Sequence, residues 1–348
     1  MNKLAIGLLV SLFCATASMG SAQAATKKAG VRYAAPAAKT QMVKRVVKVR
    51  GKNKVVYQRV TKVADFGRPT MGDLAGLNLV RDPLDLKSNV ALMLDQANSE
   101  VLFEKNAGVA LPIASITKMM TGLVVVESGQ DLDEELTVTD EDVDREKFSS
   151  SRLKVGDRLT RRNMLHIALM SSENRAASAL GRNYPGGLPA FVDAMNAKAQ
   201  ELGMSDTRYV DSSGLSKKNV ASARDLAKLV QASYEHPILR EFSTDPKAVV
   251  ENNGRPVTFG TTNRLVAPNS GWEIGLQKTG FINEAGRCLI MQAMVEGRAV
   301  IMVLLDAKGA AARVADANRM KKWLTALKPT FGDTVSGAST SAQSYSGM

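Results

Sequence analysis

The sequence is poor in the residues that form disulfides, bind metals or serve as histidine bases. Its 348 residues include two cysteines and two histidines. We expect Cys14 to be removed with an N-terminal leader, which leaves Cys288 alone and excludes an intrachain disulfide. Cys288 lies in an apolar stretch that favours a buried structural thiol. His166 and His236 lie in no G-x-S-x-G context, so a Ser-His-Asp triad and a histidine-rich metal site are disfavoured. We predict no metal and no cofactor.

Long apolar segments are missing as well. The apolar run at residues 5–14 is too short to span a bilayer comfortably. Lys3 precedes it, and the Ala-x-Ala motif Ala22-Gln23-Ala24 follows it. This combination is typical of a secretory signal peptide. We therefore predict a signal peptide at 1–24 and an exported mature chain without a transmembrane segment.

Acidic residues are absent from residues 25–64, which carry twelve lysines and arginines. The whole chain has a net charge of +12, yet the part from Asp65 onward has a net charge of −1. The positive charge therefore belongs to an N-terminal arm. Such a run is often only solvated; the alternative is attraction to an anionic surface of the cell envelope. We predict no nucleic-acid partner.

The arm offers few large apolar residues to offset the entropy of ordering, so residues 25–87 are predicted to be a disordered arm and linker. Valine alternates with lysine and arginine at 43–63, and Gly51-Lys52-Asn53 could turn this stretch into a weak hairpin instead. The folded domain is predicted at 88–328, followed by a flexible Ser- and Gly-rich tail at 329–348. Within the domain, the acidic run at 140–144 is expected to be a solvated surface.

Alternating and periodic patterns predict an α+β domain. Strands are expected at 89–94, 100–104, 274–281, 287–295 and 299–306, and helices at 162–170, 175–181, 189–202, 223–234 and 310–327. The stretch 112–121 is predicted to begin a further helix, which continues as an almost uniformly apolar run to Val126. A helix of this kind lies in the middle of a domain.

Ser115 and Lys118 lie on that buried helix, three residues apart and so on one face. A serine hydroxyl needs a base within hydrogen-bond reach to become a nucleophile. Burial and a neighbouring cation can lower a lysine pKa until the amine accepts a proton. The pattern S-x-x-K occurs often by chance, and its other interpretation is a helix start with a surface-reaching lysine.

Two further short motifs follow in order. Ser172-Glu173-Asn174 lies at a predicted break between helices, and Lys278-Thr279-Gly280 lies on a predicted strand. The first could be only a helix cap, and the second any edge-strand triplet. Glu173 is expected to be a surface residue rather than an acid catalyst. All three motifs in this order form the set known from penicillin-binding proteins and class A β-lactamases.

The chain resembles the serine DD-peptidases, and in particular low-molecular-mass penicillin-binding proteins of the D-alanyl-D-alanine endopeptidase type. The similarity covers residues 88–327 and leaves out the arm and the tail. It is carried by PIASITKMMT at 112–121, ALMSSENRAA at 168–177, YPGG at 184–187, AMNAKA at 194–199, GLS at 214–216, ARDL at 223–226 and KTGF at 278–281.

The resemblance implies a β-lactamase-like fold. An antiparallel sheet would pair the 88–104 hairpin with the C-terminal strands, with terminal helices on one face. A helical subdomain inserted at about 130–260 would cover the other face, and the three motifs would meet between them.

The resemblance also implies catalytic roles. Ser115 would attack a D-alanyl carbonyl and become acylated, and Lys118 would take its proton. Ser172 would relay a proton to the leaving amine. Asn174 would hydrogen-bond the substrate amide or Lys118.

The strand motif would bind substrate. Lys278 would lie near Lys118 and help to lower the pKa of that lysine. Lys278 and Thr279 would bind a substrate carboxylate or carbonyl, and Gly280 would permit close backbone approach. The backbone N–H groups of Ser115 and Phe281 would form the oxyanion hole.

The implied activity is hydrolysis of D-alanyl–diaminopimelate cross-links between peptidoglycan stem peptides in the periplasm, with inhibition by β-lactams. A DD-carboxypeptidase that releases terminal D-alanine would use the same residues. A class A β-lactamase needs a glutamate that holds the deacylating water, and none can be placed after Asn174. The non-enzymatic alternative is a cell-wall-binding protein that acts through its arm.

Overall fold

The structure, a computed structural model, describes residues 39–49, 52–62 and 69–327, and in the first two ranges the backbone alone. The predicted signal peptide and the predicted tail lie outside these residues. In the arm, β1 (Lys39–Val49) and β2 (Lys52–Lys62) pair as an antiparallel hairpin, with Val46 opposite Val55. The sequence predicts disorder for this arm, with a weak hairpin as the alternative. The structure instead has the hairpin alternative, as recurring β-branched valines favour extended backbone.

The segment before the first sheet strand packs against the domain, although we predicted a linker there. Thr70 caps α1 (Met71–Leu74), and its hydroxyl donates to Asp306 at 2.7 Å. Asp82 forms an ion pair with Lys105 at 2.9 Å, and both side chains are 5% exposed. The ordered domain therefore begins near residue 69 rather than 88. Its polar residues bond to groups far away in the chain, which the local pattern does not reveal.

A five-stranded antiparallel sheet in the order β11-β12-β13-β3-β4 forms the centre of the domain. As predicted, the hairpin near residue 90 pairs with the C-terminal strands. Met93 lies opposite Met302 in the β3–β13 pair. The strands are β3 (Ser88–Asp95), β4 (Val101–Lys105), β11 (Glu273–Ile282), β12 (Gly286–Val295) and β13 (Arg298–Ala307).

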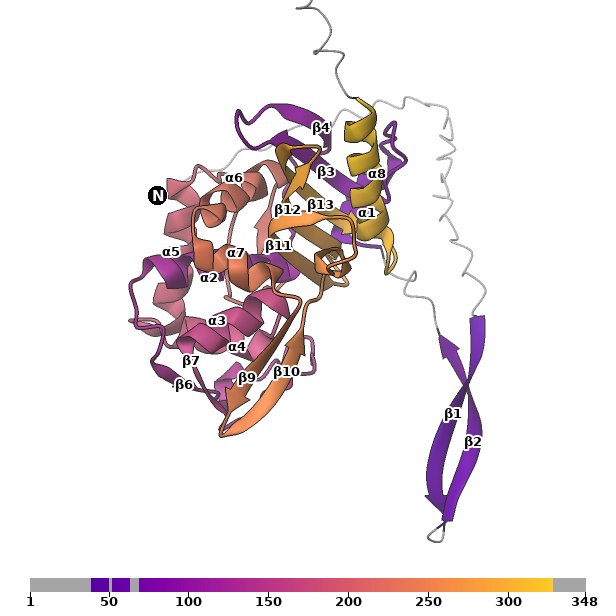
Figure 1. The fold of residues 1–348 in the computed structure, drawn as a ribbon, viewed down its shortest axis with the longest axis vertical. Coiled ribbons are helices and arrows are strands. Elements are labelled where there is room, and N and C mark those ends of the chain that lie inside the picture. Colours follow the sequence, from indigo (N-terminus) through magenta and orange to yellow (C-terminus); the bar gives the residue numbers. More distant parts are fainter. Residues whose placement is uncertain (1–38, 50–51, 63–68, 328–348) are drawn as a thin grey trace, which may run out of the picture.

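Both faces of this sheet are covered (Figure 1). In β3, Val90 and Leu92 face the helical region, whereas Ala91 and Met93 join the cluster that includes Met320 of α8 (Ala312–Ala326). A strand buried on both faces has a continuous apolar sequence, which is why the alternation is weak there. The predicted fold class is confirmed.

The buried helix predicted from the apolar run is α2 (Thr117–Glu127), which packs against α3, α4, α5 and α6. The inserted region around it also holds short strand pairs, so it is less purely helical than predicted. Its helices are α3 (Arg161–Met170), α4 (Asn174–Arg182), α5 (Gly187–Glu201), α6 (Ala223–Tyr234) and α7 (Pro237–Thr244). Its strand pairs are β5–β8 (Leu111–Pro112, Val220–Ala221), β6–β7 (Glu135–Thr137, Arg158–Thr160) and β9–β10 (Lys247–Asn252, Arg255–Gly260).

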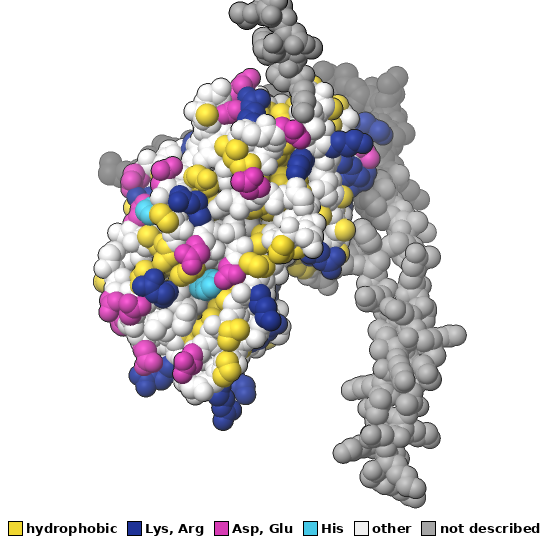
Figure 2. Space-filling view, viewed as in Figure 1, with side chains coloured by type: hydrophobic (Ala, Val, Ile, Leu, Met, Phe, Trp, Pro, Cys, Tyr) yellow, Lys and Arg dark blue, Asp and Glu magenta, His cyan; other side chains and the backbone are white. Residues whose placement is uncertain are grey.

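The acidic run at 140–144 is only partly a surface. Asp142 is buried and accepts hydrogen bonds from Ser178 at 2.9 Å and from Arg182 at 2.9 Å. Elsewhere, acidic and basic side chains are intermingled over the face shown in Figure 2. Among the described residues, no helix has both the length and the apolar character needed to cross a membrane.

Candidate active site

Ser115 lies on a short 3-10 turn, Ala114–Ile116, that leads directly into α2. The α-helix begins at Thr117, so Ser115 lies two residues before the helix, although the sequence predicts it on the helix. Ala114 has a φ of 50°, in the left-handed region that non-glycine residues rarely adopt. The Thr117 hydroxyl donates to the Ala114 carbonyl at 2.8 Å and holds this conformation. The half-buried Ser115 is thereby presented from a strained turn.

Two glycines of the matched motifs pack against this turn. A Cβ on Gly214 would lie 2.0 Å from the Ala114 carbonyl oxygen, and one on Gly280 would lie 2.8 Å from the carbonyl oxygen of Ile113. Neither distance is sterically possible without movement of the backbone. The GLS loop and the KTG strand therefore need glycine because they touch the backbone that carries Ser115.

Lys118 is fully buried, and its amine has three oxygen neighbours. Nζ lies 3.0 Å from Ser115 Oγ, 2.7 Å from Asn174 Oδ1 and 2.6 Å from the Ser213 carbonyl oxygen. The last two oxygens can only accept. A neutral amine would donate its two protons to them and direct its lone pair at Ser115. This geometry suits a base that removes the serine proton.

Burial lowers the pKa of Lys118 from the usual lysine range to about 8. The carboxylates of Asp211, Glu173 and Asp144 act in the opposite direction and limit the fall. A pKa near 8 leaves a useful fraction of the amine neutral at physiological pH.

Lys278, also fully buried, holds the other side of the site. Its ammonium donates to Ser172 Oγ at 2.9 Å and to the Thr279 carbonyl at 2.9 Å. Burial, followed by the charges of Lys118 and Arg313, lowers the pKa of Lys278 well below its usual range. We expected Lys278 to help lower the pKa of Lys118, but burial alone lowers it, whereas the charge of Lys118 is one of the causes that lower the pKa of Lys278.

The S-x-N motif occupies the break between α3 and α4, as predicted. Ser172 has a φ of 61°, which turns the chain sharply, and Asn174 is the first residue of α4. Glu173 is 8% exposed rather than a surface residue. Its carboxylate accepts from Arg175 N at the start of α4 and from Ser151 Oγ at 2.5 Å. It therefore fixes the turn between the helices.

The strand motif lies on β11. Thr279 Oγ1 is 2.6 Å from Thr262 Oγ1, and Phe281, 41% exposed, lies 4.5 Å below the guanidinium of Arg287. Arg313, which the sequence did not single out, donates to the Gly280 carbonyl at 3.3 Å from behind the strand. The assigned roles of Thr279 and Phe281 in binding substrate stay predictions.

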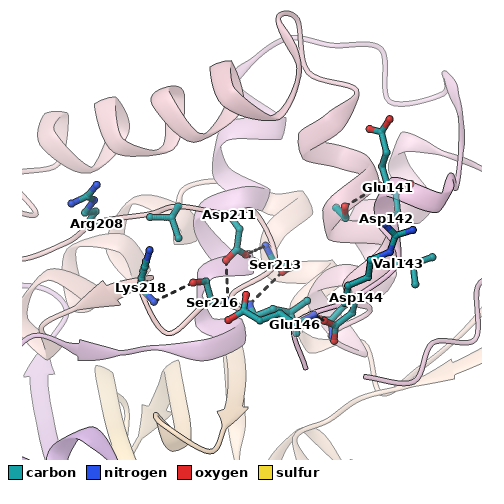
Figure 3. A pocket seen from close by; sticks show the side chains of 15 residues that line it. Glu141, Asp142, Val143, Asp144, Glu146, Arg208, Asp211, Ser213, Ser216 and Lys218 are labelled. Carbon is teal, nitrogen blue, oxygen red and sulfur yellow. Dashed lines mark hydrogen bonds between the residues drawn. The ribbon is translucent and has the colours of Figure 1, made fainter. Parts of the chain in front are cut away.

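The loop that includes GLS supplies a partner that the motifs did not predict. Asp211 Oδ1 accepts from the N–H of Ser213 at 2.7 Å and of Gly214 at 2.6 Å, which places the Ser213 carbonyl on Lys118. Figure 3 shows Asp211 at the centre of this loop. The Asp-Ser-Ser-Gly sequence is a turn signal, but its distance from Lys118 in sequence conceals the contact.

A pocket of about 530 Å³ adjoins this group, and Asn174 and Ser213 are part of its wall. The loop 141–146 forms one side, while Arg208 and Lys218 come from the other (Figure 3). Within the described part of the chain, neither Arg208 nor Lys218 forms an ion pair. The pocket wall carries charge of both signs, since acidic side chains of the loop 141–146 face Arg208 and Lys218 beside Asn174 and Ser213.

The histidines and the cysteine are outside this group. His166 stacks on Phe242 with ring centroids 4.4 Å apart, and His236 lies 3.3 Å from Glu127. Cys288 is fully buried, as predicted, and burial raises the pKa of its thiol to about 12. No cluster of metal-binding side chains occurs within the described residues.

Taken together, the buried Ser115–Lys118 pair and its neighbours have the chemistry of a serine acyl-transfer enzyme with a lysine base. Residues 78–309 match the peptidase S11 family, described as D-alanyl-D-alanine carboxypeptidase. A D-alanyl-D-alanine endopeptidase of Pseudomonas aeruginosa is 47% identical over 72% of this chain and 80% of its own. One from Escherichia coli is 41% identical over 69% and 78%. The chain therefore belongs to the peptidase S11 family of serine DD-peptidases, as the motifs predicted.

Solved structures of two related proteins have the same fold as this chain. The crystal structure of a Streptomyces DD-transpeptidase matches with a TM-score of 0.65 at 26% identity, over 71% of this chain and 100% of the other. A Listeria monocytogenes penicillin-binding protein in its cefotaxime-bound form matches with a TM-score of 0.62 at 31% identity, over 70% and 98%.

Proposed function

We propose that this protein is a periplasmic DD-endopeptidase that hydrolyses D-alanyl–diaminopimelate cross-links between peptidoglycan stem peptides. The main support is the position of the Lys118 amine, which lies 3.0 Å from Ser115 Oγ. Its two other neighbours, Asn174 Oδ1 and the Ser213 carbonyl oxygen, can only accept hydrogen bonds. The two endopeptidases at 47% and 41% identity support the choice of reaction.

In the proposed first step, Lys118 takes the Ser115 proton as Oγ attacks the D-alanyl carbonyl carbon. The N–H groups of Ser115 and Phe281 stabilise the tetrahedral oxyanion, a contribution of about 2.7–4 kcal/mol per donor in related acyl transfer. Ser172, which accepts a hydrogen bond from Lys278, relays the proton that Lys118 took to the leaving amine as the C–N bond breaks, so that Lys118 is neutral again. Water then hydrolyses the Ser115 ester. A β-lactam would form the same ester and hydrolyse slowly.

The pocket beside Asn174 supports a substrate larger than a pentapeptide end. A carboxypeptidase needs room for a single leaving D-alanine, whereas a cross-link places a second peptide at the site. A volume of about 530 Å³ is in the range of ligand-sized pockets. Arg208 and Lys218 would meet the carboxylates of a stem peptide there.

Digestion of purified muropeptides tests the proposal. Cross-linked dimers and pentapeptide monomers are incubated separately with the protein, and the products are separated by chromatography. We expect dimers to give two monomers. Release of free D-alanine from pentapeptides, with dimers left intact, would assign the protein to the carboxypeptidases instead. Fluorescent penicillin that leaves Ser115 unlabelled would favour a non-catalytic wall-binding protein.

A further inference from the structure

A loop outside the three motifs reaches the active site. Asp144 accepts hydrogen bonds from the backbone N–H groups of Glu146, Lys147 and Ser149 at 2.8–2.9 Å. It also accepts from the Ser149 hydroxyl at 2.6 Å. One carboxylate thus closes the loop 144–149 on itself and fixes the position of Ser149.

The direction of the hydrogen bonds from this loop to Lys118 is determined by chemistry. A lysine amine bound to an amide must donate to its oxygen, so Asn174 presents Oδ1 to Lys118 at 2.7 Å. The Asn174 Nδ2 then points away and donates to Ser149 Oγ at 2.8 Å. Ser149 passes the bond on to Asp144, which can only accept when ionised. Asp144 therefore lies at the end of a chain with one consistent polarity.

The loop is also tied to the central sheet. Lys147 forms an ion pair at 2.7 Å with Glu284, in the turn between β11 and β12, and both side chains are less than one third exposed. The loop therefore spans from the helical region to the strand pair that carries Lys278. This second attachment keeps Ser149 facing Asn174.

Charge at Asp144 reaches Lys118 as well. The groups that act on the Lys118 amine are Asp211, Glu173 and Asp144, each of which raises its pKa, against the lowering by burial. Lys278 faces it from β11. Removal of the Asp144 charge would therefore leave Lys118 easier to deprotonate.

We propose that Asp144 and Ser149 are positioning residues for acylation, which hold the Asn174 amide so that the Lys118 lone pair faces Ser115. This inference rests on the proposed function in one respect, since it takes Ser115 as the nucleophile and Lys118 as its base. With a freely rotating Asn174, the amine would lose one of its two fixed acceptors. The lone pair would then point at Ser115 for a smaller part of the time.

The test is the rate constant for acylation by fluorescent penicillin, measured on the purified protein from pH 6 to 9. Ser149→Ala should lower it on the order of tenfold, which corresponds to the loss of one hydrogen bond. Ser149→Thr keeps the hydroxyl and should restore most of the rate. Ser150→Ala, at the exposed neighbour, should behave as wild type. Asp144→Asn keeps the shape, and the acidic limb of its pH profile should move to lower pH.

Two outcomes would overturn the inference while wild type is still labelled at Ser115. One is an unchanged rate in Ser149→Ala. The other is an equal loss in Ser149→Ala and Ser149→Thr, with an unmoved pH limb in Asp144→Asn, which would reduce the loop to a structural role. Wild type that is not labelled at Ser115 would instead overturn the proposed function. Thermal unfolding of each variant separates a folding defect from lost positioning.

Discussion

Lysine occurs in two contrasting settings in this protein. In the cleft, Lys118 and Lys278 are fully buried within hydrogen-bond reach of Ser115 and Ser172. In the arm, twelve lysines and arginines follow one another without an acidic residue. In the first setting, burial lowers the pKa of Lys118, so that this side chain can lose its proton and act as a base. The second gathers charge of one sign, which can act only by long-range attraction that salt screens over ~8 Å at physiological ionic strength.

The comparison shows that residue type alone does not assign a role. Desolvation is the main cause of the low pKa of Lys118, and a solvated lysine lacks it. Charge density, by contrast, is a property of composition and needs no particular fold. If the two settings have separate roles, changes to the buried lysines should affect catalysis, and changes to the arm should affect only binding to anionic surfaces.

The largest effect is expected at Ser115, the hydroxyl group from which Lys118 is proposed to remove a proton. Ser115→Ala should abolish penicillin labelling and peptide cleavage, a loss of about 10³-fold or more by analogy with other nucleophile deletions. Mass spectrometry of the acylated protein maps the ester. Labelling that persists in the variant at a different serine would contradict the assignment.

The second-largest effect on acylation is expected from Lys118→Arg. Arginine keeps the positive charge but does not deprotonate in a protein. The variant should fail at acylation by at least about 10²-fold, the lower end of what a general base contributes. Lys48→Arg in the arm is the matched control and should be silent. Near-normal acylation by Lys118→Arg would show that Lys118 is not the base. The buried lysine would then have no catalytic role that the lysines of the arm lack.

The pH dependence of acylation sharpens the same contrast. A base must be neutral to accept the Ser115 proton, and burial lowers the pKa of Lys118 to about 8. The rate constant should rise by about tenfold per pH unit below that pH and level off above it. Stopped-flow measurement with a chromogenic β-lactam gives the profile. A rate that stays flat between pH 6 and 8 would show that the base is already neutral there.

The pocket beside Asn174 is lined by two exposed cations, Arg208 and Lys218, which belong to neither of the two settings. Arg208→Ala and Lys218→Ala should each slow the cleavage of cross-linked dimers by up to about fivefold, as exposed ion pairs are worth ~0–1 kcal/mol. Penicillin labelling, which involves no second peptide, should not change. Lys154→Ala, outside the pocket, is the control. Equal loss of both activities would mean that the pocket supports the fold and does not bind peptide.

The smallest catalytic effect is expected from the arm. Deletion of residues 25–64 should leave penicillin labelling intact, because every predicted catalytic residue lies in the domain. Sedimentation with isolated cell walls or anionic vesicles should weaken at low salt and converge with that of the longer protein at high salt. If both proteins sediment equally at low ionic strength, the arm acts only as a spacer.

The sequence by itself determined the three motifs, their order and the elements that carry them. The apolar run of α2 and the continuous strands of the sheet have patterns that local chemistry fixes, since a uniformly apolar helix or strand has to be buried. Gly280 and Gly214 were also visible as parts of matched motifs. The charge of the arm follows directly from composition.

Tertiary structure decided what surrounds those motifs. Ser213 and Asp144 act on Lys118 from loops that are distant in sequence, and no periodic pattern marks such contacts. Glu173 and Asp142 look like surface charges because the pattern does not show partners such as Ser151 and Arg182, which lie elsewhere in the chain. The segment 70–87 looks like a linker for the same reason, since Thr70 donates to Asp306 near the far end of the chain and Asp82 pairs with Lys105 of β4. Burial and long-range hydrogen bonds are properties of the assembled fold, and burial is what lowers the pKa of Lys118 below that of an ordinary lysine.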